Sequence, residues 1–243
     1  MDKVTEYISH VENAIQCADN NVTKLTNSQF SIVGMSSRKI RIFLNEMIKQ
    51  DTNYLEIGVW CGSTFTSALY ANQYKSAIAI DNFSEFTEKF YLDQCKTLED
   101  LQRLAESELN IIHNVDSVFL KNCSENDITN FKLIESDCFN LSQTDFDSIK
   151  DVNVYLYDGG HSIEDQRKAL TYYINNLSDV FIFIVDDWNF PDAKIGTRLG
   201  IQETNIKIHK EWELQANVVA NYGNGDLKNW WNGYYVAVCE KQK

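Results

Sequence analysis

Short apolar runs that each end near an acidic residue recur between residues 53 and 187. The runs are continuous rather than alternating, which is typical of strands that are buried on both faces in a parallel sheet. They are NYLEIG (53–58), SAIAID (76–81), FKLIES (131–136), VNVYLYD (152–158) and VFIFIVDD (180–187). This pattern predicts five strands of a mostly parallel sheet.

Apolar residues at helical spacing fill three intervals between these runs. The intervals are about 63–72, 84–110 and 162–176. A further helix is predicted at 37–49, where Ser36 or Ser37 can cap the first turn. Its apolar face consists of Ile40, Phe43, Leu44, Met47 and Ile48. Strands that alternate with helices predict a doubly wound α/β fold.

The two ends of the chain depart from this alternation. Apolar residues at helical spacing predict an N-terminal helix, and they are Val4, Ile8, Val11 and Ile15. IKIHKEWEL (206–214) and GYYVAVCEK (233–241), separated by a loop rich in Gly and Asn, predict an antiparallel pair. The expected fold is therefore a Rossmann-like, doubly wound sheet of seven strands. It is mostly parallel, with an antiparallel C-terminal strand and helices on both faces.

The sequence shows no linker and no internal repeat, and its one proline is Pro191. We therefore expect a single domain over residues 1–243, with an N-terminal helical extension at 1–30 and the α/β fold at 31–243. Two segments are open to two interpretations. The long segment 83–130 exceeds a normal crossover and is a candidate lid. Trp230 and Trp231 either wall a substrate pocket or plug the core.

Composition narrows the classes of partner. The chain has 243 residues, 44% of them hydrophobic, and a net charge of −13, which indicates a globular protein. This charge disfavours nucleic acid and anionic membranes, and it favours a small-molecule substrate. No apolar run approaches the roughly 18 residues of a membrane span. Six cysteines without a CxxC pair predict reduced thiols and a cytoplasmic protein, and the sequence is compatible with a homo-oligomer.

Acidic residues fall at or near the carboxyl ends of the predicted strands. They are Glu56, Asp81, Asp137, Asp158, Asp186 and Asp187. Ligands of open α/β sheets bind just beyond these strand ends. We therefore expect the acids to share one edge of the sheet and to line a binding site.

The segment LEIGVWCGSTF (55–65) predicts a strand, a glycine turn and the start of a helix. Gly58 permits a tight turn, and Gly62 opens the helix. Because position 60 is Trp, the dinucleotide fingerprint GxGxxG is absent. Asp81, at the end of the second strand, is placed to accept hydrogen bonds from ribose hydroxyls. Asp137 could accept one from an adenine amino group, with Cys138 beside the ring.

A second group of residues lies in LYDGGHSIED (156–165) and VDDWN (185–189). His161 precedes Ser162, a plausible helix N-cap, and is therefore fixed at a strand-to-helix corner. Asp158, Asp186 and Asp187 lie at neighbouring strand tips, where carboxylates repel one another unless a proton or a cation intervenes. Three hard oxygen ligands suit Mg²⁺. The pattern predicts a divalent-metal site with His161 beside it.

These motifs resemble those of class I S-adenosylmethionine-dependent methyltransferases. Within that superfamily the chain is similar to the family-24 type and to metal-dependent small-molecule O-methyltransferases, including those that act on catechols, macrolide sugars and aminocoumarin sugars. The resemblance covers about residues 30–240. It implies that the methionine end of the cofactor is surrounded by Glu56, Gly58, Gly62, Ser63 and Thr64.

The same resemblance implies roles for the second group. In the metal-dependent enzymes, an acid at the tip of strand four and an acid-acid or acid-Asn pair at the tip of strand five bind the ion. A base follows the strand-four acid by three positions, which is His161 here; catechol-type enzymes have Lys there, and some sugar enzymes have His. We therefore expect methyl transfer to a hydroxyl of a sugar, polyol or catechol-like molecule, with the proton taken by His161. The alternatives are a non-catalytic module that binds S-adenosylmethionine, and a nucleotide-sugar or dinucleotide enzyme.

Overall fold

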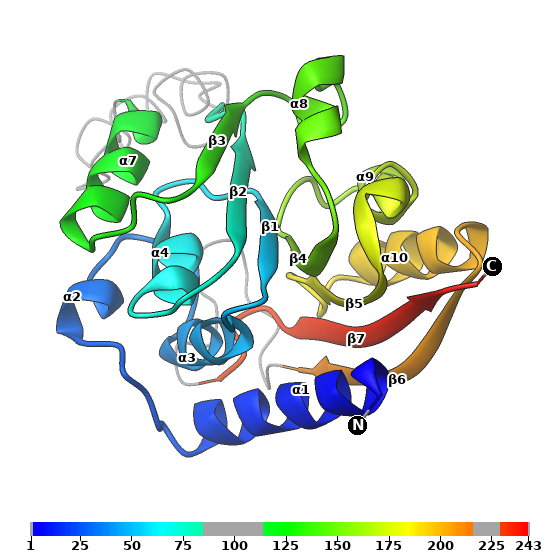
Figure 1. Cartoon of the computed structure of the whole chain (residues 1–243), viewed down its shortest axis with the longest axis horizontal. Helices are drawn as coiled ribbons and strands as arrows, with labels where there is room; N and C mark the ends of the chain where they lie inside the picture. The colour runs from blue at the N-terminus through cyan, green and yellow to red at the C-terminus, as the bar shows by residue number, and fades with distance from the viewer. Residues whose placement is uncertain (1, 85–113, 216–228, 243) are drawn as a thin grey trace, which may run out of the picture.

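A seven-stranded sheet forms the centre of the molecule (Figure 1). The computed structural model describes residues 2–84, 114–215 and 229–242. The strands are β1 (Asn53–Ile57), β2 (Ser76–Asp81), β3 (Lys132–Glu135), β4 (Val152–Tyr157), β5 (Leu177–Val185), β6 (Ile206–Leu214) and β7 (Tyr234–Lys241). Their order in the sheet is β3-β2-β1-β4-β5-β7-β6. β1 therefore lies in the middle of the sheet, β2 and β3 are added on one side of it, and β4 and β5 are added on the other.

The first five strands are parallel, and β7 runs antiparallel to both β5 and β6. This arrangement confirms the predicted fold class, including the antiparallel C-terminal pair. Every residue of β1 and of β4 is buried, which explains why these strands have continuous apolar runs.

Helices cover both faces of the sheet (Figure 1). The helices are α1 (Lys3–Asp19), α2 (Asn27–Phe30), α3 (Arg38–Met47), α4 (Ser63–Leu69), α7 (Val115–Glu125), α8 (Gln143–Ser148), α9 (Ile163–Thr171) and α10 (Pro191–Glu203). Residues of α1, α3, α4 and α7 pack into one hydrophobic core, and residues of α8, α9 and α10 pack into a second core on the other face.

Helix boundaries follow local capping. The Ser37 hydroxyl accepts a hydrogen bond from the backbone of Ile40 at 3.2 Å and starts α3 as predicted. Ser162 caps α9 in the same way, at 3.1 Å from the backbone nitrogen of Asp165. The helix predicted at 162–176 is shorter, because α9 ends at Thr171 and a 3₁₀ turn at Ile174–Asn176 follows.

Two differences from the sequence predictions concern whole elements. Helix α10 was not predicted, although Pro191 occupies its first turn, where a missing N–H costs nothing. The helix predicted at 84–110 and most of the candidate lid lie outside the described residues; α7 is the described part of that segment.

The tandem tryptophans belong to the core. Trp230 and Trp231 are both buried in the hydrophobic core on the α3 side of the sheet. The ring of Trp230 packs edge-on against Phe43, with 5.8 Å between ring centroids. This packing indicates that the two rings fill the hydrophobic core rather than line a substrate pocket.

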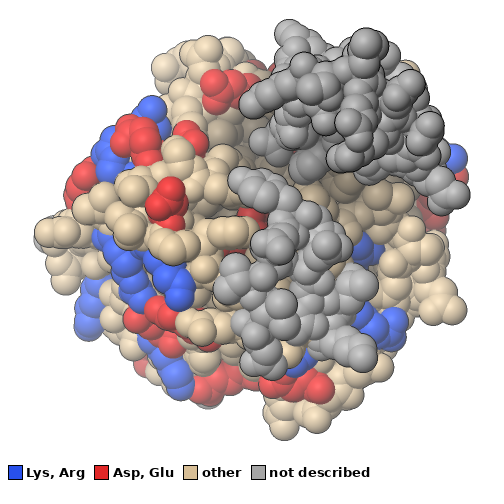
Figure 2. Space-filling model, turned by 180° about the vertical axis from the view of Figure 1, so that it is seen from behind, with Lys and Arg blue, Asp and Glu red and all other residues tan. Residues whose placement is uncertain are grey.

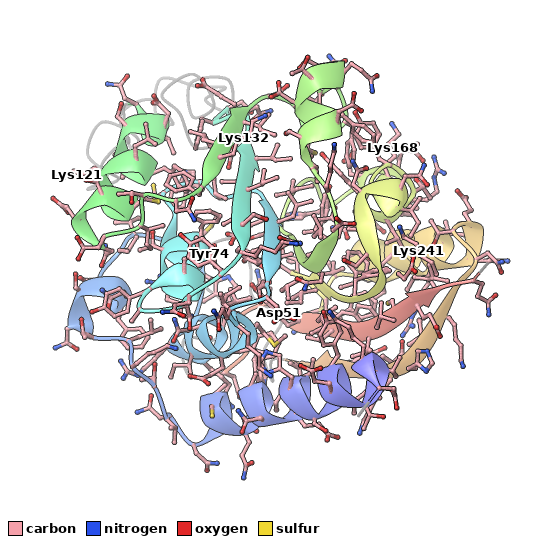
Figure 3. All side chains as sticks on the ribbon, viewed as in Figure 1. Asp51, Tyr74, Lys121, Lys132, Lys168 and Lys241 are labelled. Carbon is pink, nitrogen blue, oxygen red and sulfur yellow. The ribbon has the colours of Figure 1, made fainter. Side chains whose placement is uncertain are left out.

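The edge of the sheet from which the strands start lies away from the predicted site. Asp51 and Tyr74, labelled in Figure 3, lie just before β1 and β2 and mark this amino-terminal edge. The acids predicted to bind ligands follow the other ends of the strands. Among the described residues, no helix is long and apolar enough to cross a membrane.

The N-terminal helix packs against the core of the fold. Helix α1 contacts α3, β5 and β7, and Val11 and Ala14 are fully buried. We predict that Val11→Ala lowers the free energy of unfolding by about 2 kcal/mol, because two buried carbon groups and their contacts are lost. Urea denaturation measures this change.

Val22 provides the matched control, since 58% of it is exposed after the end of α1. Val22→Ala should change stability by less than about 0.5 kcal/mol. An equal loss of unfolding free energy in the two variants would show that α1 does not pack against the core as described.

Candidate functional site

Backbone hydrogen bonds hold neighbouring strand ends level at the carboxyl edge of the sheet. Each bond joins the residue just past one strand to the end of the next. The pairs are Ser136 with Asp81 at 3.0 Å, Gly58 with Ile80 at 2.9 Å, Asp158 with Ile57 at 2.9 Å, and Asp186 with Tyr157 at 3.1 Å. The sequence prediction that the acids share one edge is therefore confirmed.

The turn after β1 approaches β4 closely. Gly58 has φ +84°, and a Cβ there would lie 1.8 Å from the carbonyl oxygen of Asp158. Gly62 has φ +81° and precedes the first residue of α4. A Cβ at this position would lie 2.8 Å from the ring of Phe119. Both positions therefore require glycine. Ser63, the first residue of α4, is buried beside this turn.

Glu56 is fully buried below the turn. Its carboxyl accepts hydrogen bonds from the hydroxyls of Tyr54 and Thr64, both at 2.5 Å. Burial raises the pKa of Glu56 to about 8. This residue is thus protonated at neutral pH for much of the time, and it ties β1 to α4.

Asp81 holds the backbone of the same turn from the end of β2. Its two carboxylate oxygens accept from the backbone nitrogens of Trp60 and Phe83, each at 2.7 Å. Burial outweighs these bonds and raises the pKa of Asp81. Each carboxylate oxygen has a second lone pair, so the carboxylate keeps acceptor capacity for the predicted ribose contact.

The predicted adenine residues follow β3. Asp137 is exposed, and its carboxylate accepts from the backbone nitrogen of Phe139 at 2.9 Å. Cys138 is half-buried, and its carbonyl accepts a hydrogen bond from the Tyr173 hydroxyl. Burial raises the pKa of the Cys138 thiol to about 12, so the thiol is neutral. Contact with adenine stays a prediction.

His161, Asp158 and Asp187 form a compact cluster. His161 Nε2 lies 2.7 Å from Asp187 Oδ2, and the three residues offer ligand atoms that all lie within 4.8 Å of one another. Asn232, just before β7, donates from Nδ2 to Asp187 Oδ1 at 2.8 Å. The His161 ring also stacks on Phe190, with 6.2 Å between centroids. The structure therefore brings together residues from β4, β5 and β7.

Asp186, which the sequence also predicted as a metal ligand, is not among the three residues whose ligand atoms lie close together. Asp187 has φ +58° and leaves the strand geometry, so the two adjacent carboxyls need not face the same side. Asp186 is buried, and burial together with the charges of Asp158 and Asp187 raises its pKa well above the ordinary value. Its Oδ1 atom is buried without a hydrogen-bond partner.

Sequence reasoning missed three contributors to the site. Tyr54 lies two residues before Glu56 in β1, so the two side chains share one face of the strand. Asn232 meets Asp187 only through the tertiary fold. Arg41 is buried next to Ser36, with Nε donating to the Ser36 hydroxyl at 2.9 Å. Its signal was a charged residue within the apolar periodicity of the predicted helix 37–49.

No family model and no curated protein matches this sequence. Among solved structures, the chain is similar to M. jannaschii TYW2 in complex with AdoMet, with TM-score 0.54 and 10% identity over 92% of this chain and 81% of that one. It is similar to M. capricolum TrmK in complex with S-adenosyl-homocysteine, with TM-score 0.50 and 16% identity over 86% and 70%.

A further similar structure is Streptococcus pneumoniae Sp1610, a proposed tRNA (m1A22) methyltransferase, in complex with S-adenosyl-L-methionine. It has TM-score 0.50 and 13% identity over 85% of this chain and 73% of that one. The chain therefore shares its Rossmann-like fold with these solved structures, each of which holds S-adenosylmethionine or S-adenosylhomocysteine. At these identities the similarity establishes the fold, as the sequence resemblance predicted.

We predict a pH-dependent contribution of Glu56 to stability. Its pKa of about 8 in the folded protein exceeds the ordinary value of 4.5, so folding is favoured while the carboxyl is protonated. The contribution is fully present below about pH 4.5 and is lost as pH rises through 8. Glu56→Gln should therefore gain stability relative to the wild type over this window, on the order of 3 kcal/mol.

Urea denaturation at pH 5, 6.5 and 8 tests this prediction. Glu125→Gln is the control, because Glu125 is exposed at the end of α7. A difference between Glu56→Gln and wild type that does not change with pH would contradict a protonated Glu56.

Proposed function

We propose that the protein is an S-adenosylmethionine-dependent methyltransferase that transfers a methyl group to a hydroxyl of a small molecule. One observation carries the proposal. A single edge of the sheet holds both the glycine turn with Asp81 and the cluster of Asp158, His161 and Asp187. A nucleoside cofactor and an acceptor could therefore be held side by side, which is the main requirement for a two-substrate transfer.

For the cofactor, we propose that the methionine end lies against the turn after β1 and the start of α4. Its neighbours would be Glu56, Gly58, Gly62, Ser63 and Thr64. Asp81 would accept from the ribose hydroxyls, and Asp137 with Cys138 would contact adenine. The fold supports this placement, and so does the close approach of backbone that Gly58 and Gly62 allow.

Asp158 and Asp187 of the cluster, together with the neighbouring Asp186, offer carboxylate ligands to a divalent cation. Carboxylate oxygens are ligands that Mg²⁺ prefers, and the buried, unpartnered Oδ1 of Asp186 is an acceptor that a cation would satisfy. We propose that Asp158, Asp186 and Asp187 would hold such an ion. An ion bound there would lower the pKa of an acceptor hydroxyl. Asn232 would keep Asp187 oriented.

His161 is the proposed base. In the neutral imidazole, the contact between Nε2 and Asp187 Oδ2 places the proton on Nε2 and makes Nδ1 the basic nitrogen. Stacking on Phe190 and the hydrogen bond to Asp187 fix the ring plane. His161 would then take the proton of the acceptor hydroxyl, and bound S-adenosylmethionine would supply the methyl group and leave as S-adenosylhomocysteine.

The charge of the molecule supports a small acceptor over an RNA. The net charge is −13, Arg167 is paired with Glu164 and Glu203, and Arg198 is paired with two further glutamates. On the face shown in Figure 2, Lys and Arg side chains lie among Asp and Glu side chains. An RNA-binding surface requires a local excess of positive charge.

We predict that the protein binds S-adenosylhomocysteine with a dissociation constant in the micromolar range, about −8 kcal/mol, in a calorimetric titration. NAD should bind at least tenfold more weakly, because the pyrophosphate fingerprint is absent. Tight binding of NAD together with no binding of S-adenosylhomocysteine would favour the dinucleotide enzyme instead.

We predict that His161→Ala keeps the affinity for S-adenosylhomocysteine but lowers the transfer rate by roughly 10²–10⁴-fold, the usual contribution of a positioned base. Asp158→Asn should abolish metal-dependent turnover, and EDTA should do the same to the wild type until Mg²⁺ is restored. Release of S-adenosylhomocysteine is measured with panels of sugars, polyols, catechols and tRNA.

His209→Ala is the matched control for His161→Ala. His209 is paired with Glu240 at 2.8 Å, between β6 and β7 and away from the cluster, so its loss should leave the rate unchanged. Full activity in EDTA would show that the transfer needs no divalent cation. Methylation of tRNA in preference to every small acceptor would show that the substrate is RNA and not a small molecule.

A further inference from the structure

Arg41 is the one charged side chain among the buried residues of α3. Only 4% of it is exposed. Nη1 donates to the carbonyl oxygens of Gln29 at 2.9 Å and of Ile32 at 3.0 Å, and Nε donates to Ser36 Oγ at 2.9 Å. The guanidinium therefore holds the segment between α2 and α3 against the core.

These partners are neutral, so none of them balances the positive charge. Burial lowers the pKa of Arg41 to about 10, which leaves it ionised at neutral pH. In the described part of the chain, no carboxylate forms an ion pair with Arg41. A buried charge without an opposite charge costs several kcal/mol, and hydrogen bonds to carbonyl groups offset only part of that cost.

The guanidinium lies at the corner where Ser63 begins α4. Ser36 Oγ, which accepts from Arg41, lies 3.3 Å from Ser63 Oγ. A Cβ placed on Gly34 would lie 1.9 Å from Ser63 Oγ and 3.4 Å from Arg41 Nη2. Nη2 donates no hydrogen bond to any described residue. The two N–H groups of Nη2 and the positive charge of the guanidinium therefore lie beside Ser63 without an acceptor among the described residues.

We propose that Arg41 binds the carboxylate of the amino-acid part of the cofactor, with the hydroxyls of Ser36 and Ser63 as neighbouring donors. The inference rests on the proposed function, because that function puts the methionine end of S-adenosylmethionine beside Ser63. An anion at this corner neutralises the buried charge and occupies the donors of Nη2. Arg41 is then a binding residue as well as a clamp for the loop.

The proposal predicts a measurable difference in binding affinity, because the contact is a charge-assisted hydrogen bond. Loss of one such contact costs roughly 10- to 100-fold in affinity. The wild type should therefore bind S-adenosylhomocysteine 10- to 100-fold more tightly than its decarboxylated analogue, S-adenosyl-3-thiopropylamine. This comparison changes only the ligand, so it does not depend on whether any variant folds.

The experiment is a cycle of calorimetric titrations with these two ligands. Arg41→Gln should bind both ligands with similar affinity, because it keeps a polar side chain but loses the charge. Arg41→Lys should recover part of the preference for the carboxylate. Arg198→Gln is the matched control, since Arg198 is paired with Glu211 and Glu213 and should leave the preference unchanged. Circular dichroism verifies that each variant is folded.

The outcomes separate this inference from the proposed function. If the wild type binds both ligands equally, or if folded Arg41→Gln keeps the full preference, Arg41 is only a structural clamp and the inference is wrong. If Arg41→Gln does not fold, the wild-type comparison together with Arg41→Lys decides. If the wild type binds neither ligand, the cofactor assignment itself is wrong.

Discussion

The level carboxyl ends of β2, β1, β4 and β5 are the constraint on which the candidate site depends. Backbone hydrogen bonds from Gly58, Asp158 and Asp186 to the ends of the adjacent strands set this register. A shift of one residue in any strand would turn its terminal side chain to the other face of the sheet. Packing of side chains on both faces of the sheet fixes the same register, so the hydrophobic core also positions the site.

This placement has an electrostatic cost. Several acids converge on one edge, and two buried ones, Glu56 and Asp186, have raised pKa values. The protein offsets the cost in different ways. Hydroxyls of Tyr54 and Thr64 donate to Glu56, whereas one oxygen of Asp186 has no partner. Under the proposed function, the unpartnered oxygen of Asp186 would be satisfied by the bound cation.

The sequence predicted those parts of the structure that depend on local pattern. Continuous apolar runs gave the parallel strands, and Ser37 and Ser162 gave two helix starts. Helix α10 was missed because its apolar positions are interrupted by Gly196 and Gly200, which allow close contact with α9. Asn232 could not be found, because it lies 45 residues from Asp187 and meets it only through the antiparallel pairing of β7 with β5.

The charges of the site also bear on how a cofactor would be oriented. Arg41 is positive at the Ser63 corner, and the acids Asp158 and Asp187 lie at the tips of β4 and β5. S-adenosylmethionine carries a carboxylate at one end of its amino-acid chain and a sulfonium, with the transferable methyl, at the other. Opposite charges attract across a site of low dielectric. Under the proposed function, the carboxylate would turn toward Arg41, and the sulfonium methyl would turn toward the acids and His161. The same arrangement that neutralises the buried arginine would therefore present the methyl group to the acceptor.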